Sequence, residues 1–162
     1  MPHDTLTTLS TLVGTRLKAK GFMLGTAESC TGGWVGQALT AISGSSDYYG
    51  CGFITYSNSA KHEILGVPSS LLEQFGAVSE ETARAMAAGA LVHAKADIAL
   101  AITGVAGPGG GSGRNPVGTV CFGWAMKGSE PQSARKHFDG DRDAVRRQSV
   151  IFSLQGVLER LE

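Results

Sequence analysis

The stretch Thr26-Ala27-Glu28-Ser29-Cys30-Thr31-Gly32-Gly33 joins a short apolar run to a segment with helical spacing of apolar residues. It predicts a strand over Met23–Ala27 that turns directly into a helix over Trp34–Ile42. Backbone N–H groups at such a helix start have no partner within the helix and favour negative charge, either a phosphate or an oxyanion. Ser29 therefore lies where a nucleophile would use them.

Strand and helix patterns alternate along the rest of the chain. Strands covered on both faces form unbroken apolar runs, and polar strands are typical of sheet edges. Alternation of this kind predicts an α/β fold: residues 1–162 form a single three-layer α/β/α domain with a mixed, mostly parallel sheet of about five strands, the last two antiparallel to each other. The remaining predicted strands are Tyr49–Ser57, Ile98–Ile102, Pro116–Met126 and Ser133–Phe138. Four more helices are predicted: one over Leu6–Leu17, a short one that starts near Asn58, and two that follow caps at Ser79 and Asp141.

Length and charge narrow the class of partner. With 162 residues the chain is long enough for one core, and its 14 basic residues balance 14 acidic ones. This balance disfavours nucleic acid and anionic membranes, and leaves a small molecule or a protein as partner. Apolar surface left exposed would allow a homodimer, and the sequence leaves the oligomeric state open.

The cysteines and the N-terminus indicate the compartment. Three cysteines and four histidines form no metal-binding signature, so we expect reduced thiols and no structural zinc. We also expect no metal or organic cofactor, because a nucleophile, a base and oxyanion donors suffice to cleave an amide. No apolar run approaches the length of a membrane span, and Met1-Pro2-His3-Asp4 lacks the pattern of a signal peptide. We therefore expect a cytoplasmic protein.

Three segments are predicted to meet beyond the carboxyl ends of the strands, where α/β sheets bind ligands. They are the loop at Ser29, the segment after Tyr56 and the glycine-rich loop Thr103–Gly111. Glycines in that loop would let backbone N–H groups approach a phosphate or ribose, or would simply give a connector. The loop matches no nucleotide-binding fingerprint, but its position after a buried strand favours binding.

Ser29 needs a base, because a free hydroxyl is a weak nucleophile. The histidines lie in a tail, in helical patterns or on the edge strand, so a histidine-based triad has little support. Lys61 is a better candidate: with Asn58 or Ser59 as cap it lies in the first turn of a helix, where the dipole lowers the pKa of an ammonium. Otherwise it is a solvated surface lysine. Tyr56 either relays protons or packs.

Cys30 and Arg142 each allow two interpretations. Cys30 is a rival nucleophile, because a thiol at a helix N-terminus has a lowered pKa, or it is a small buried residue behind the serine. Arg142 shares a helix face with Arg146 and would hold a phosphate, or it pairs with Asp143 on the surface.

A set of motifs taken in order resembles the CinA carboxy-terminal domain family, the nicotinamide-nucleotide amidases. The resemblance covers the chain from Leu6 to the terminal helix, and the set is far more specific than any one motif. It is carried by Ala27-Glu28-Ser29-Cys30-Thr31-Gly32-Gly33, Gly44-Ser45-Ser46, Thr55-Tyr56-Ser57-Asn58-Ser59-Ala60-Lys61, Gly76-Ala77-Val78-Ser79-Glu80, Thr103-Gly104-Val105-Ala106-Gly107-Pro108, Pro116-Val117-Gly118-Thr119-Val120 and Gly140-Asp141-Arg142.

The resemblance implies hydrolysis of the carboxamide of nicotinamide mononucleotide to nicotinate mononucleotide and ammonia. It implies Ser29 as nucleophile, Lys61 as base and Tyr56 as assistant. Backbone N–H groups from Cys30 to Gly33 would hold the oxyanion. By the same resemblance the substrate site comprises Cys30, Thr31, Gly32, Gly33, Thr103, Gly104, Ala106, Gly107 and Arg142. The alternatives are a non-catalytic nucleotide-binding or interaction module and an amidase for other small amides.

Overall fold

Thr26, Ala27 and Glu28 belong to strand β1 (Leu24–Glu28), whose five residues are all buried, and Ser29 directly follows the strand. In this computed structural model, which describes residues 5–162, β1 pairs in parallel with β2 (Tyr49–Ile54) and β3 (Ile98–Gly104). Strand β4 (Thr119–Met126) runs antiparallel to β3, and β5 (Gln132–His137) runs antiparallel to β4. Within the described residues the sheet order is β2-β1-β3-β4-β5, so the predicted five-stranded mixed sheet is confirmed.

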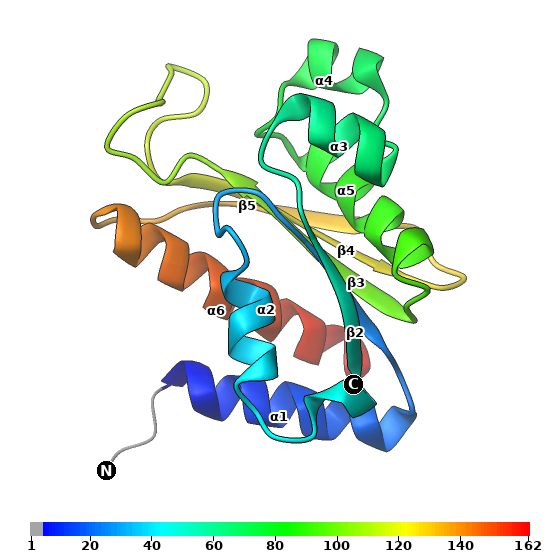
Figure 1. Cartoon of the computed structure of the whole chain (residues 1–162). Coiled ribbons are helices and arrows are strands. Elements are labelled where there is room, and N and C mark those ends of the chain that lie inside the picture. Colours follow the sequence, from blue (N-terminus) through cyan, green and yellow to red (C-terminus); the bar gives the residue numbers. More distant parts are fainter. Residues whose placement is uncertain (1–4) are drawn as a thin grey trace.

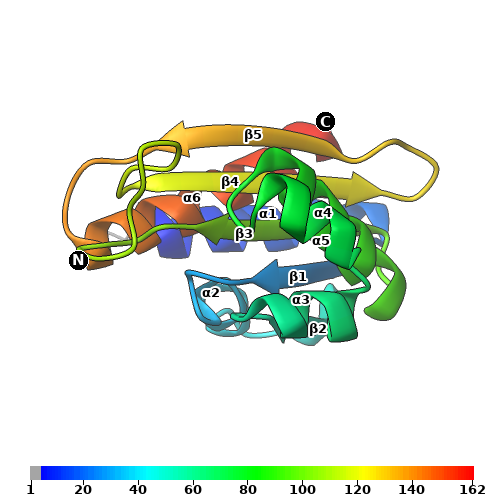
Figure 2. The ribbon, with the colours of Figure 1, turned by 90° about the horizontal axis from the view of Figure 1, so that it is seen from above.

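Helices cover both faces of this sheet (Figures 1 and 2), which gives the predicted three layers. The N-terminal tetrapeptide, on which the signal-peptide expectation rested, lies outside the described residues. Within them, no helix combines the length and apolarity that a membrane crossing needs. One face carries α1 (Thr5–Lys20), α2 (Trp34–Thr40) and α6 (Arg142–Leu161), and the other α3 (Asn58–Leu65), α4 (Ser69–Phe75) and α5 (Glu80–His93).

Element boundaries differ from the sequence prediction where side chains or proline end a pattern. Strand β2 stops at Ile54, because Ser57 is the cap of α3 and its hydroxyl accepts a hydrogen bond from the N–H of Ala60. The cap prediction of Asn58 or Ser59 was therefore wrong by one or two residues. Strand β4 begins at Thr119 rather than Pro116, whose missing N–H excludes it from the ladder.

Helix α5 packs closely on the sheet and on α3 through its small residues. A Cβ added at Gly123 of β4 would overlap the carbonyl oxygen of Ala83, and a Cβ added at Gly89 would overlap that of Leu65. The second contact fixes the end of α3 against α5, so these glycines allow backbone approaches that any larger residue would prevent.

The site lies where the parallel strands end. Figure 2 shows the arrowheads of β1 and β3 directed toward the same end of the sheet, where the loop after β3 and the start of α6 also lie. The segments expected to form the site therefore meet as the sequence predicted.

Candidate active site

Ser29 and Lys61 form a buried pair. Ser29 directly follows β1 and is 7% exposed, and Lys61 lies in α3 and is 1% exposed. The Nζ atom of Lys61 is 3.0 Å from the Oγ atom of Ser29, and it donates to the carbonyl oxygens of Thr55 (2.9 Å) and Tyr56 (3.1 Å). The alternative of a solvated surface lysine is therefore wrong.

Burial lowers the pKa of Lys61 below its usual 10.5. The neutral amine has two N–H donors and one lone pair. If the carbonyls of Thr55 and Tyr56 accept the two N–H groups, the lone pair faces the hydroxyl of Ser29. This arrangement suits proton transfer from serine to lysine. The main cause of the lowered pKa is therefore burial, and not the helix dipole that the position of Lys61 in the sequence suggested.

Cys30 is poorly suited to act as the nucleophile. Burial raises the pKa of its thiol to about 12, against the opposing effects of its backbone N–H and of nearby Arg146. The thiol therefore stays protonated at neutral pH, and the thiolate is the reactive form. Of the two interpretations of Cys30, the structure favours the small buried residue beside the serine.

The carboxylate of Glu28, 2% exposed, fixes the loop after Ser29. It accepts hydrogen bonds from the hydroxyl of Thr31 (2.6 Å) and the N–H of Val35 (2.9 Å), and from the N–H groups of Gly33 and Gly36 at 3.2 Å each. Glu28 thus accepts hydrogen bonds from the backbone N–H groups at the start of α2, which were predicted from the sequence to bind a substrate anion. The sequence did contain a sign of this role, because a charged carboxylate at the end of an apolar strand needs hydrogen-bond donors close to it.

A hollow of about 200 Å³ lies between the serine loop and the loop after β3. The side chain of Tyr56 lines it and is 65% exposed, while the carbonyl of the same residue holds Lys61. The NH1 group of Arg142 donates to the carbonyl of Gly107 at 2.9 Å. The lining residues are Cys30, Tyr56, Gly104, Val105, Ala106, Gly107, Gly109, Gly110 and Arg142.

Two threonines of the predicted substrate site point elsewhere. Thr31 is fully buried, with its hydroxyl on Glu28. Thr103 is 1% exposed, and its hydroxyl donates to the carbonyl of Ala77 at 2.8 Å. Both side chains therefore hold the loops that line the hollow rather than lining it themselves.

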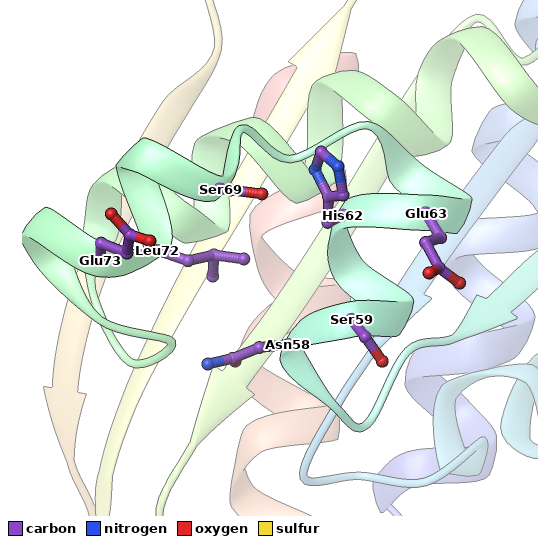
Figure 3. A pocket seen from close by; sticks show the side chains of 7 residues that line it. All are labelled: Asn58, Ser59, His62, Glu63, Ser69, Leu72 and Glu73. Atoms are coloured by element: carbon purple, nitrogen blue, oxygen red, sulfur yellow. The ribbon is translucent and has the colours of Figure 1, made fainter.

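Two further hollows differ in their relation to the serine. One of about 490 Å³ adjoins the first through the shared residues Ala106 and Arg142 and extends to the start of α6. Another of about 350 Å³ lies between α3 and α4 (Figure 3), where Asn58, His62, Ser69 and Leu72 are among its walls. None of the predicted site residues lines the hollow in Figure 3, whereas Cys30, Tyr56 and Arg142 line the hollow of about 200 Å³.

Comparison with known proteins gives matches over nearly the whole chain. The family model described as the CinA C-terminal domain matches residues 6–161. The protein named nicotinamide-nucleotide amidohydrolase PncC from Enterobacter agglomerans is 52% identical over 158 residues, which cover 98% of this chain and 96% of the relative. Its namesake from Escherichia coli (strain K12) is 52% identical over 155 residues, covering 96% and 94%.

A solved structure shows the same fold. The crystal structure of a competence-damaged protein (CinA) superfamily protein from Klebsiella pneumoniae matches with a TM-score of 0.93 and 41% identity. The match covers 98% of each chain. The likeness thus extends to the complete arrangement of sheet and helices.

Proposed function

Because the chain belongs to the CinA C-terminal domain family, we propose that it is a nicotinamide-nucleotide amidohydrolase that converts nicotinamide mononucleotide to nicotinate mononucleotide and ammonia. Curated relatives with 49–52% identity over nearly the whole chain carry that name. The observation that carries the proposal is the buried contact of 3.0 Å between Lys61 and Ser29 beside a hollow.

The reaction starts with attack of the Oγ atom of Ser29 on the carboxamide carbon, while the Nζ atom of Lys61 takes the hydroxyl proton. Backbone N–H groups of the loop stabilise the oxyanion. Lys61 then delivers the proton to the departing ammonia, and the nicotinate acyl group remains on Ser29 as an ester. Water activated by Lys61 hydrolyses the ester and restores the serine. These steps need no metal and no organic cofactor.

The substrate extends from Ser29 toward Arg142. The pyridinium ring lies beside Cys30 and Tyr56, and the loop from Gly104 to Gly107 lines the ribose. The phosphate lies at Arg142, whose guanidinium reaches the hollow from the start of α6. We assign the reaction to the cytoplasm, where the thiols of Cys30, Cys51 and Cys121, free in the structure, remain reduced.

The test supplies the purified protein with nicotinamide mononucleotide, nicotinamide riboside or free nicotinamide and follows ammonia and the acid product. We expect equal amounts of ammonia and nicotinate mononucleotide from the nucleotide, and slower release from the riboside and the free base. Nucleotide binding without ammonia release would instead support a non-catalytic nucleotide module. Equal rates with all three compounds would support an amidase of broad specificity.

A further inference from the structure

Arg146 of α6 contacts the loop that carries the proposed nucleophile. Its Nε donates to the carbonyl of Cys30 at 3.0 Å and its NH2 to the carbonyl of Thr31 at 3.1 Å. The guanidinium also lies over the ring of Trp34, 5.6 Å from the ring centroid. One side chain therefore holds two successive peptide groups from a helix more than a hundred residues away in the sequence.

These contacts decide where the loop amides point. In a trans peptide the C=O and N–H groups point in opposite directions. With the carbonyls of Cys30 and Thr31 directed at Arg146, the N–H groups of Thr31 and Gly32 point away from it. The N–H of Gly32 donates to the carbonyl of Ser29 at 3.1 Å.

The N–H groups of Cys30 and Thr31, next to Ser29, are available to bind an anion. The N–H of Gly33 donates to Glu28, so among residues 5–162 the amides of this loop that donate to no protein oxygen are those of Cys30 and Thr31, and the first of these lies beside its own thiol. Neighbouring backbone N–H groups in such a turn form an anion-binding concavity. The N–H of the residue that follows a nucleophile is also a frequent oxyanion donor.

We infer that Arg146 is a positioning residue for the oxyanion site of the amidase. It fixes the Cys30–Thr31 peptide, whose N–H is one of the two available donors, and the Thr31–Gly32 peptide, whose N–H holds the carbonyl of Ser29 and so orients the N–H of Cys30. This inference rests on the proposed function. The planar guanidinium presents two donors in a fixed geometry, which matches two successive carbonyls, whereas an ammonium is a single point charge. Gly32 has a positive φ of 60°, and a Cβ added there would lie 3.4 Å from the NH2 of Arg146, so glycine also suits this contact.

The test compares Arg146→Lys with Arg160→Lys in the full chain. Arg160 is a matched control because it also lies in α6, stacks on a tryptophan (4.0 Å from the ring centroid of Trp124) and donates to a carbonyl, that of Gly156. For Arg146→Lys we expect kcat to fall roughly ten- to a hundredfold, as for a misplaced oxyanion donor. The KM for nicotinamide mononucleotide and the thermal midpoint should stay near those of the wild type. Arg160→Lys should retain kcat.

A second measurement separates positioning from folding. Arg146→Ala should lose kcat, and added methylguanidinium should restore part of it, whereas methylammonium at the same concentration should not. Unchanged kcat in Arg146→Lys, or a loss that tracks only the unfolded fraction and that methylguanidinium leaves unaltered, overturns the inference. A wild-type protein that releases no ammonia overturns the proposed function itself, which distinguishes the two failures.

Discussion

Lys61 is buried in the interior of the protein, where a positive charge is unfavourable. Its side chain is 1% exposed, and no Asp or Glu among residues 5–162 forms an ion pair with it. An unpaired buried ammonium is costly, so the neutral amine is favoured and its pKa falls. The same burial that makes Lys61 unfavourable for the fold therefore makes it useful as a base.

The first prediction concerns the pH dependence that follows from this lowered pKa. Protonated Lys61 cannot accept the proton of Ser29, so kcat/KM should rise as the pH increases through the lowered pKa, at a pH below 10.5. Lys61→Arg should be inactive, because a guanidinium keeps the charge but does not accept a proton. Full activity in Lys61→Arg, or a kcat/KM that does not rise with pH anywhere below 10.5, would contradict the role of base.

Single residues were predictable where their chemistry and position coincide. Ser29 and Lys61 could be proposed from a strand end and a helix start, because loops at such ends concentrate functional groups. The role of Arg146 as a loop contact was not predictable, since its partners Cys30 and Thr31 are distant in the sequence. Spacing along the helix grouped Arg146 with Arg142, although the two guanidinium groups bind different loops.

At the scale of elements, α3 positions Lys61. The helix is held at its start by the Ser57 cap and at its end by the contact of Leu65 with Gly89 of α5. A shift of α3 would carry the Nζ atom of Lys61 away from Ser29. Packing between two helices therefore controls a hydrogen bond at the active site.

The second prediction is that Gly89→Ala both destabilises the protein and lowers kcat. The new Cβ would overlap the carbonyl oxygen of Leu65, and overpacking of this kind costs about 1–3 kcal/mol. Thermal unfolding and steady-state kinetics provide the measurements. Gly113→Ala is the control, because a Cβ there has no neighbour within 4 Å and should leave both unchanged. Equal midpoints for Gly89→Ala and the wild type would show that the contact is not needed.

Elements were predictable where the pattern is long and local. The helices α1, α5 and α6 could be predicted from their apolar stripes, and the buried strand β3 from its unbroken apolar run. Helix α4 (Ser69–Phe75) was not predicted, because its cap residue, Pro68, makes no side-chain hydrogen bond to the helix and so gives no capping signal in the sequence. The antiparallel pairing of β4 with β3 was also not predicted, because strand direction is decided by tertiary pairing rather than by the strand's own residues.

At the scale of the whole molecule, topology assembles the site. The parallel strands β1, β2 and β3 end on one side of the sheet, and α6 begins there after crossing from the edge strand β5. This brings Ser29, Lys61 and Arg142 around adjoining loops although they lie far apart in the chain. The sequence allows a homodimer but does not decide the oligomeric state, and a homodimer stays a proposal.

The third prediction is that Arg142 reads the substrate phosphate. Arg142→Ala should raise KM for nicotinamide mononucleotide about ten- to a hundredfold, as expected from a charge-assisted hydrogen bond of roughly 1.5–3 kcal/mol. The riboside, which lacks the phosphate, should be hydrolysed equally by the mutant and the wild type. An equal loss with both substrates would show that the arginine only holds Gly107 and its loop.

The most direct test of Ser29 as the nucleophile is ammonia release from nicotinamide mononucleotide by Ser29→Ala, measured beside Cys30→Ala and the wild type. If Ser29 is the nucleophile and Lys61 its base, Ser29→Ala should lose about a thousandfold or more in kcat while still binding the nucleotide. Cys30→Ala should remain active, because its thiol, with a pKa of about 12, is not the attacking group. Comparable ammonia release by Ser29→Ala, or loss of activity in Cys30→Ala alone, would show that Ser29 is not the nucleophile.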